Sequence, residues 1–117
     1  MAGLSTHILD TSTGRPGAGI RICLHRLSGT QRELIGDYQS NSDGRVDHPL
    51  LTSETATVGQ YELTFYVGDY FRASGTALSE PAFLDDVVLR FAISDSSQHY
   101  HVPLLISPWA YSTYRGS

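Results

Sequence analysis

Hydrophobic and polar residues alternate with a period of two along most of the chain, the pattern of strands with one buried face. The clearest example is 18–28 (AGIRICLHRLS), where Ile20, Ile22 and Leu24 occupy every second position. Similar runs are found at 4–10, 32–39, 59–68, 86–95, 99–106 and 109–115, with a shorter one at 45–50. Short strands at this spacing predict an all-β protein.

Turn-forming sequences separate these runs. TSTGRPGAG follows the first strand, NSDG occupies 41–44, and Ser107-Pro108 joins the last two strands. One segment, DYFRASGT at 69–76, fits a short helix that begins at Asp69 as N-cap and stops at Gly75. With no internal repeat or linker, the pattern predicts a single domain over 1–117, an antiparallel β-sandwich with at most one short helix.

Composition narrows the classes of function. The 117 residues are 40% hydrophobic and 17% charged, as in an ordinary globular domain. The net charge is −4 and no segment concentrates positive charge, so neither nucleic acid nor an anionic membrane is an expected partner. The N-terminal MAGLSTHILD lacks the features of a signal peptide, and no run approaches the roughly 20 apolar residues of a membrane span. We therefore expect a soluble, cytoplasmic protein.

All eight basic residues are arginines, which excludes a lysine Schiff base or a lysine general base. The single cysteine, Cys23, excludes an intramolecular disulfide. Because Cys23 lies in an alternating strand, we expect a buried, unreactive thiol, with a catalytic cysteine as the alternative. The sequence also lacks a GxSxG nucleophile motif, a P-loop and a dinucleotide fingerprint.

Two histidines, His99 and His101, fall on the same face of one predicted strand, with Tyr100 and Val102 on the other. Such a pair can ligate a metal, supply a general base or simply face solvent. No cysteine pair, HxxxH motif or nearby carboxylate cluster offers a third ligand, so no metal site is expected. By themselves His7, in the first strand, and Arg45, after NSDG, read as ordinary structural or surface residues, as do His25 and His48.

Several motifs together resemble the 5-hydroxyisourate hydrolases, the transthyretin-related enzymes of uric acid breakdown. The motifs are LSTHILDTSTGRPGAGI at 4–20, SDGR at 42–45, HYHVPLLISP at 99–108 and YSTYRGS at 111–117. The resemblance runs from residue 4 to the last residue. The YRGS ending is its most specific element, because transthyretin itself, a hormone carrier on the same fold, lacks it.

The resemblance implies a transthyretin-like sandwich of two four-stranded sheets with a short helix after the fifth strand. It also implies a homotetramer with active sites at the dimer–dimer interface, 5-hydroxyisourate as the small-molecule substrate, and no cofactor. The family's catalytic positions match His7, Arg45, His101 and Tyr114. His99 shares the face of His101 and is expected to assist in binding substrate.

The terminal Ser117 completes the motif, and its carboxylate is expected to reach the site. Two other classes of function stay open: a transthyretin-like carrier of a hormone or small ligand without catalysis, and a β-sandwich adhesion or scaffold module. A carrier has no need for titratable groups in its channel, and a scaffold module gives no reason for an aromatic-rich C-terminus that ends in YRGS.

Overall fold

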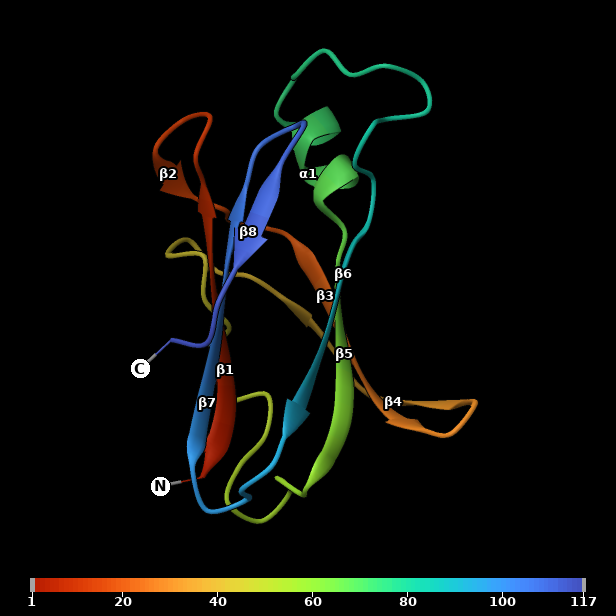
Figure 1. The fold of residues 1–117 in the computed structure, drawn as a ribbon. Helices are drawn as coiled ribbons and strands as arrows, with labels where there is room; N and C mark the ends of the chain where they lie inside the picture. Colours follow the sequence, from red (N-terminus) through yellow and green to blue (C-terminus); the bar gives the residue numbers. More distant parts are fainter. Residues whose placement is uncertain (1, 117) are drawn as a thin grey trace.

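The computed structural model describes residues 2–116, which form two facing sheets and one short helix (Figure 1). The first sheet has the strand order β2-β1-β7-β8, and the second has the order β4-β3-β5-β6. In chain order the elements are β1 (Gly3–Asp10), β2 (Arg15–Pro16), β3 (Arg21–Ser28), β4 (Gln31–Gln39), β5 (Gly59–Phe65), α1 (Val67–Ala73), β6 (Val87–Ile93), β7 (His99–Ile106) and β8 (Tyr111–Thr113). The predicted sandwich of two four-stranded sheets is confirmed.

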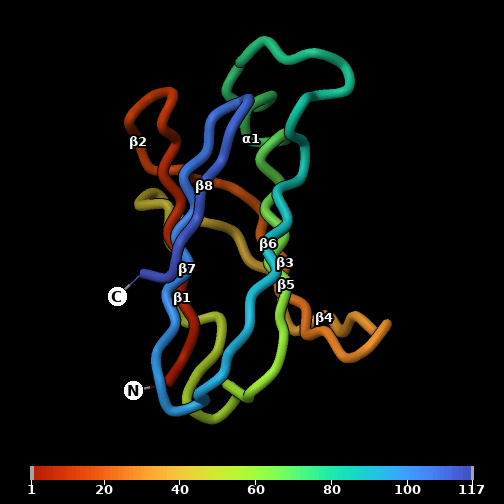
Figure 2. The backbone as a smooth tube through the Cα atoms, in the orientation of Figure 1, coloured from red at the N-terminus to blue at the C-terminus, as the bar shows by residue number. Residues whose placement is uncertain are grey.

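Strands β1 and β7, which are far apart in the sequence, lie side by side in the first sheet (Figure 2). They pair in parallel over their full length, from Gly3 opposite His99 to Asp10 opposite Ile106. The other strand pairs within residues 2–116 are antiparallel. Hydrophobic alternation is the same in both kinds of pair, so the sequence pattern did not reveal the parallel one.

The core lies between the sheets and uses the faces that the alternation predicts. Ile22 and Leu24 of β3 are fully buried, as are Leu4 and Ile8 of β1. Each such side chain contributes about 1.5–3 kcal/mol by leaving water. In β7 the inward-facing side chains include Tyr100, 5% exposed, and Val102, 7% exposed. His99 and His101 therefore point outward from the first sheet, on a shared face as predicted.

The outer face of the second sheet is more buried than alternation alone suggests. Glu62, in the middle of β5, is only 4% exposed. Arg32 Nε donates a hydrogen bond to its Oε2 at 2.8 Å, and Arg90 Nε lies 3.5 Å from its Oε1. The arginine side chains lie across the strand and exclude water from the carboxylate. The alternation of hydrophobic and polar residues does not predict this burial.

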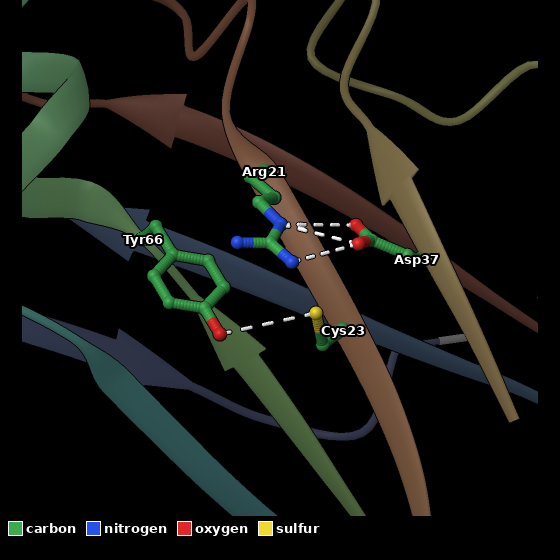
Figure 3. A network of polar contacts seen from close by, with 4 residues as sticks. All are labelled: Arg21, Cys23, Asp37 and Tyr66. Atoms are coloured by element: carbon green, nitrogen blue, oxygen red, sulfur yellow. Dashed lines mark hydrogen bonds and ion pairs between the residues drawn. The ribbon is translucent and has the colours of Figure 1, made fainter. Parts of the chain in front are cut away.

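The surroundings of Cys23, on the same outer face, are shown in Figure 3. Cys23 is 4% exposed, and the Tyr66 hydroxyl donates a weak hydrogen bond to its Sγ at 3.9 Å. The Arg21 guanidinium lies 4.9 Å from the centre of the Tyr66 ring and pairs with Asp37 at 2.8 Å. The predicted burial of this thiol is confirmed.

Helix α1 begins at Val67, so the prediction of Asp69 as its N-cap was wrong. The N-terminal backbone is satisfied from outside the helix instead: Gly68 N donates to the carbonyl of Asp85 at 2.8 Å. Gly75, with φ +83°, follows the last turn as predicted. No helix in residues 2–116 has the length and apolar character to cross a membrane.

The segment 44–51 runs along the edge of β1 without forming the strand predicted at 45–50. Ile8 N donates to the Gly44 carbonyl at 2.8 Å, and Leu4 N donates to the Leu51 carbonyl at 3.0 Å. Between these two points the segment bends, and Pro49 has no N–H to give to a ladder. The final strand is also shorter than the predicted 109–115, because regular pairing with β7 covers only Tyr111–Thr113.

Candidate active site

The outward face of the first sheet collects polar side chains from β1 and β7. Ser5 of β1 is the direct parallel partner of His101, and Gly3 is the partner of His99. Because side chains alternate along a strand, His7 lies on the same face as Ser5, one step further along β1. The parallel pairing thus brings His7 together with the two histidines that the HYH motif supplies.

A single hydroxyl joins the two histidines of β7. Ser5 Oγ lies 2.8 Å from Nδ1 of His101 and 2.9 Å from Nε2 of His99. His99 is exposed, whereas Ser5 and His101 are half-buried. Ser5 was not predicted as a site residue, since its contact with His101 depends on the strand register.

The loop after β4 brings Arg45 to the other side of β1. Arg45 forms an isolated antiparallel bridge with His7. The Asn41 side-chain oxygen accepts hydrogen bonds from the backbone N–H groups of Asp43 and Arg45, at 2.9 Å and 3.1 Å, which holds the NSDG turn. Gly44 has φ +76°, and a Cβ there would collide with the Ile8 carbonyl. The turn therefore needs glycine in order to place Arg45 beside His7.

A cavity of about 270 Å³ opens between this loop and the sheet. Its walls include Ser5 and His99 from the strands, together with Arg45 and His48 from the loop. Within residues 2–116, Arg45 has no ion-pair partner, so its guanidinium is available to an anionic or strongly polar ligand. His48, which was expected to be an ordinary structural or surface residue, also lines this cavity, and its place in the same loop as Arg45 was the only sign of this.

The surroundings of His101 favour its neutral form. Partial burial lowers its pKa below the usual 6.5, and the positive charge of Arg45 lowers it further, with smaller contributions from His7 and His99. The backbone of Ser5 opposes this shift in the pKa of His101. A neutral imidazole with a free nitrogen can accept a proton at pH 7. No hydrogen bond engages Nε2 of His101 within residues 2–116.

The chain returns to this site at its C-terminal end. Gly116 N donates to the carbonyl of His101 at 2.8 Å, and the two residues form an isolated antiparallel bridge. A Cβ at Gly116 would lie 2.6 Å from Cδ2 of the His101 ring. The Arg115 guanidinium lies 4.0 Å from the centre of the Tyr100 ring and donates to Gln98 Oε1 at 2.9 Å. The glycine of the YRGS ending thus packs directly against His101.

Within residues 2–116, Tyr114 makes no hydrogen bond or ion pair with the other predicted site residues. It is 61% exposed and contributes to a separate cavity of about 460 Å³ at the edges of β6 and β8. The role predicted for Ser117 lies outside the described residues. His7, Arg45, His99 and His101 form one group, and the role of Tyr114 stays a prediction. No cluster of three or more potential metal ligands occurs in the described part of the chain.

Known proteins match this chain over nearly its full length. It is 57% identical over 114 residues to 5-hydroxyisourate hydrolase 2 of Rhizobium meliloti strain 1021, an alignment that covers 97% of this chain and 95% of that protein. The structure of Klebsiella pneumoniae 5-hydroxyisourate hydrolase superposes with a TM-score of 0.82 at 35% identity, with all of both chains covered.

A crystal structure of (S)-allantoin synthase superposes with a TM-score of 0.93 at 49% identity. The match covers 99% of this chain but 44% of the synthase, so the chain spans less than half of that longer protein. The family model described as HIUase/Transthyretin matches residues 4–116. The chain therefore belongs to the HIUase/Transthyretin family.

Proposed function

We propose that this protein hydrolyses 5-hydroxyisourate to 2-oxo-4-hydroxy-4-carboxy-5-ureidoimidazoline. The observation that carries the proposal is the convergence of His7, Arg45, His99 and His101 on one outward face of the first sheet. Relatives with the name 5-hydroxyisourate hydrolase match the chain over nearly its full length, which supports the same choice of substrate. A carrier of a neutral ligand has no use for this set of titratable groups.

The chemistry of the reaction fits these side chains. Water attacks a ring amide carbonyl of a planar, polar bicyclic substrate, and the C–N bond then opens. The reaction needs a base to take a proton from water and an acid to protonate the departing nitrogen. His101, whose low pKa keeps it neutral, and His7 share this work. Arg45 stabilises the oxyanion that develops on the attacked carbonyl or holds the substrate oxygens.

Tyr114, His99 and the Ser117 carboxylate complete the proposed site as groups that bind and orient the substrate. The roles of Tyr114 and Ser117 are proposed from the match to the YRGS ending. The role of His99 is proposed from its position on the outward face of β7. No metal or organic cofactor takes part in the proposed reaction, because water is activated by imidazole alone.

We further propose that the protein acts in the cytoplasm as a homotetramer with its sites at the dimer–dimer interface. Two features of the single chain support assembly. Strands β6 and β8 end their sheets without a further partner in residues 2–116, and they border the same cavity. Open strand edges of this kind favour pairing between copies. Light scattering should give four times the 12.8 kDa of one chain, and a monomer would contradict the assembly.

The activity itself is tested with freshly made substrate. Urate and urate oxidase generate 5-hydroxyisourate, and the decay of its absorbance is followed with and without this protein. We expect His101→Asn to lower turnover by about 10²-fold or more, as for the loss of an acid–base group. His25→Asn, the same change on the second sheet, is the matched control and should keep full turnover. If the wild-type protein leaves the decay unchanged, the proposal is wrong.

A further inference from the structure

Ser5 Oγ carries one proton but faces two imidazole nitrogens at hydrogen-bond distance, Nδ1 of His101 and Nε2 of His99. It can donate to only one of them, and to complete the second bond it must accept a proton from the other. The proton positions on the two rings are therefore linked. When Ser5 donates to His99, His101 carries its proton on Nδ1 and its Nε2 is a base. When Ser5 donates to His101, that Nε2 carries a proton and is an acid.

We infer that Ser5 links His101 to His99 as a proton relay, which lets one nitrogen of His101 serve first as base and then as acid. The inference rests on the proposed hydrolysis and adds a positioning residue to it. Ser5 does not itself need to touch the substrate, since it acts through the two rings.

The relay balances in protons. As water attacks, His101 Nε2 takes its proton, the Nδ1 proton of His101 moves to Ser5 Oγ, and the Ser5 proton moves to His99 Nε2. The positive charge then lies on His99, which is exposed and keeps its Nδ1 proton throughout. In the second half the Nε2 proton of His101 goes to the departing nitrogen, the Ser5 proton returns to His101 Nδ1, and Ser5 takes the Nε2 proton of His99. His99 is then neutral again with its proton on Nδ1, and both rings and Ser5 are back in their starting states.

The fold holds both rings in place for this exchange. Gly3 stands beside His99, and a Cβ there would lie 3.3 Å from Nδ1 of His99 and 2.8 Å from the Leu51 carbonyl. Gly116 stands in the same relation to His101. Glycine on each side leaves room for the two imidazoles to reach the hydroxyl between them.

The charges around the pair favour movement of a proton toward His99. His7 on β1 and Arg45 in the loop both disfavour positive charge on the half-buried His101. Asp47 and His48 line the same cavity as His99. A positive charge is thus disfavoured on the half-buried His101, from which the relay removes it.

Three variants test the relay. Ser5→Ala removes the hydroxyl, Ser5→Thr keeps it on a residue suited to a strand, and Ser53→Ala makes the alanine change at an exposed turn position. We expect kcat to fall by about 10–10²-fold in Ser5→Ala, up to the lower end of acid–base contributions, and most of this activity to be recovered in Ser5→Thr. Ser53→Ala should match the wild-type protein.

Two readouts separate a relay from packing. In mixtures of H₂O and D₂O, the wild-type rate should depend on deuterium content along a curve, because several protons move together, whereas Ser5→Ala should give a straight line. Equal losses in Ser5→Ala and Ser5→Thr, or a curve that survives in Ser5→Ala, would overturn the relay.

Imidazole ¹⁵N shifts without substrate give a test that does not depend on activity: the Ser5→Ala change should alter the tautomers of both His99 and His101. If the wild-type protein is inactive, the proposed function fails while this test still decides whether the rings are coupled.

Discussion

Replacing Gly116 with alanine places a methyl group against the side of the His101 ring. The new Cβ would lie 2.6 Å from Cδ2 of His101. Carbon atoms that are not bonded to each other settle about 3.5–4.0 Å apart, so the ring or the tail must move by about 1 Å. If the ring moves, its 2.8 Å hydrogen bond to Ser5 is distorted together with the direction of Nε2. A displacement of about 1 Å in a catalytic group can cost about 10²-fold in rate.

The tail resists the alternative movement. It is held by the bond from Gly116 N to His101, by a 2.7 Å hydrogen bond from Thr113 Oγ1 to the Pro103 carbonyl, and by Arg115 against Tyr100. Loss of the first bond alone costs about 1 kcal/mol of unfolding free energy. We therefore expect Gly116→Ala to keep most of its stability while kcat/KM for 5-hydroxyisourate falls by about 10²-fold.

Gly29→Ala is the matched control for this change. Gly29 lies in the β3–β4 turn of the second sheet, with φ +61° and nothing within 4 Å of an added Cβ. Alanine there costs about 1–2 kcal/mol through its backbone conformation and leaves the site untouched. Activity and thermal unfolding are measured for both variants. Gly116→Ala at wild-type activity, or a loss no greater than that of Gly29→Ala, would refute the packing argument.

Three further changes test single interactions. Arg45→Gln removes a positive charge that helps to lower the pKa of His101 below 6.5, so the acid limb of the pH profile of kcat/KM should move to higher pH; an unmoved limb would contradict this. Glu62→Gln should lower the unfolding free energy in urea at pH 7 by about 1–3 kcal/mol. Burial raises the pKa of Glu62, but its two arginines outweigh burial and hold that pKa below 4.5. This stabilisation is therefore complete above pH 4.5, and the gap between the two proteins should narrow at lower pH rather than widen. Tyr70→Phe removes a 2.8 Å hydrogen bond to Asp10 and should cost about 1 kcal/mol at pH 7. Burial, with Asp10, raises the pKa of Tyr70 from 10.0 to about 12, so the difference in melting temperature from wild type should shrink between those pH values, and a constant difference would count against it.

The sandwich was predictable because alternation decides which side of a strand is buried. The strand at 99–106 was predicted with its correct limits, and the outward direction of its histidines followed from the inward direction of Tyr100 and Val102. Alternation fails where burial comes from long neighbours rather than from the core. Glu62 occupies a polar position of β5 but is buried under two arginine side chains.

The candidate site was only partly predictable, since its contacts depend on which strands are neighbours. His7 and Arg45 were selected by motif, and their bridge follows from the path of the loop along β1. Ser5 has no unusual sequence context, and only the parallel register places its hydroxyl beside His101. The packing of Gly116 against His101 likewise becomes visible only in the three-dimensional structure. Propensity and spacing carry no information on contacts between residues so distant in the chain.

The pairing of β1 with β7 also sets the order in which the reactive cluster can arise during synthesis. Ser5 and His101 are 96 positions apart. Strands β3 to β6 follow one another in the chain, so their sheet can assemble before β7 has been made. The first strand has no parallel neighbour until β7 has been made, and closing so long a loop is slow. Catalytic competence is thus acquired at the end of folding, and an interrupted chain that ends before residue 99 contains a half-built sandwich without a functional centre.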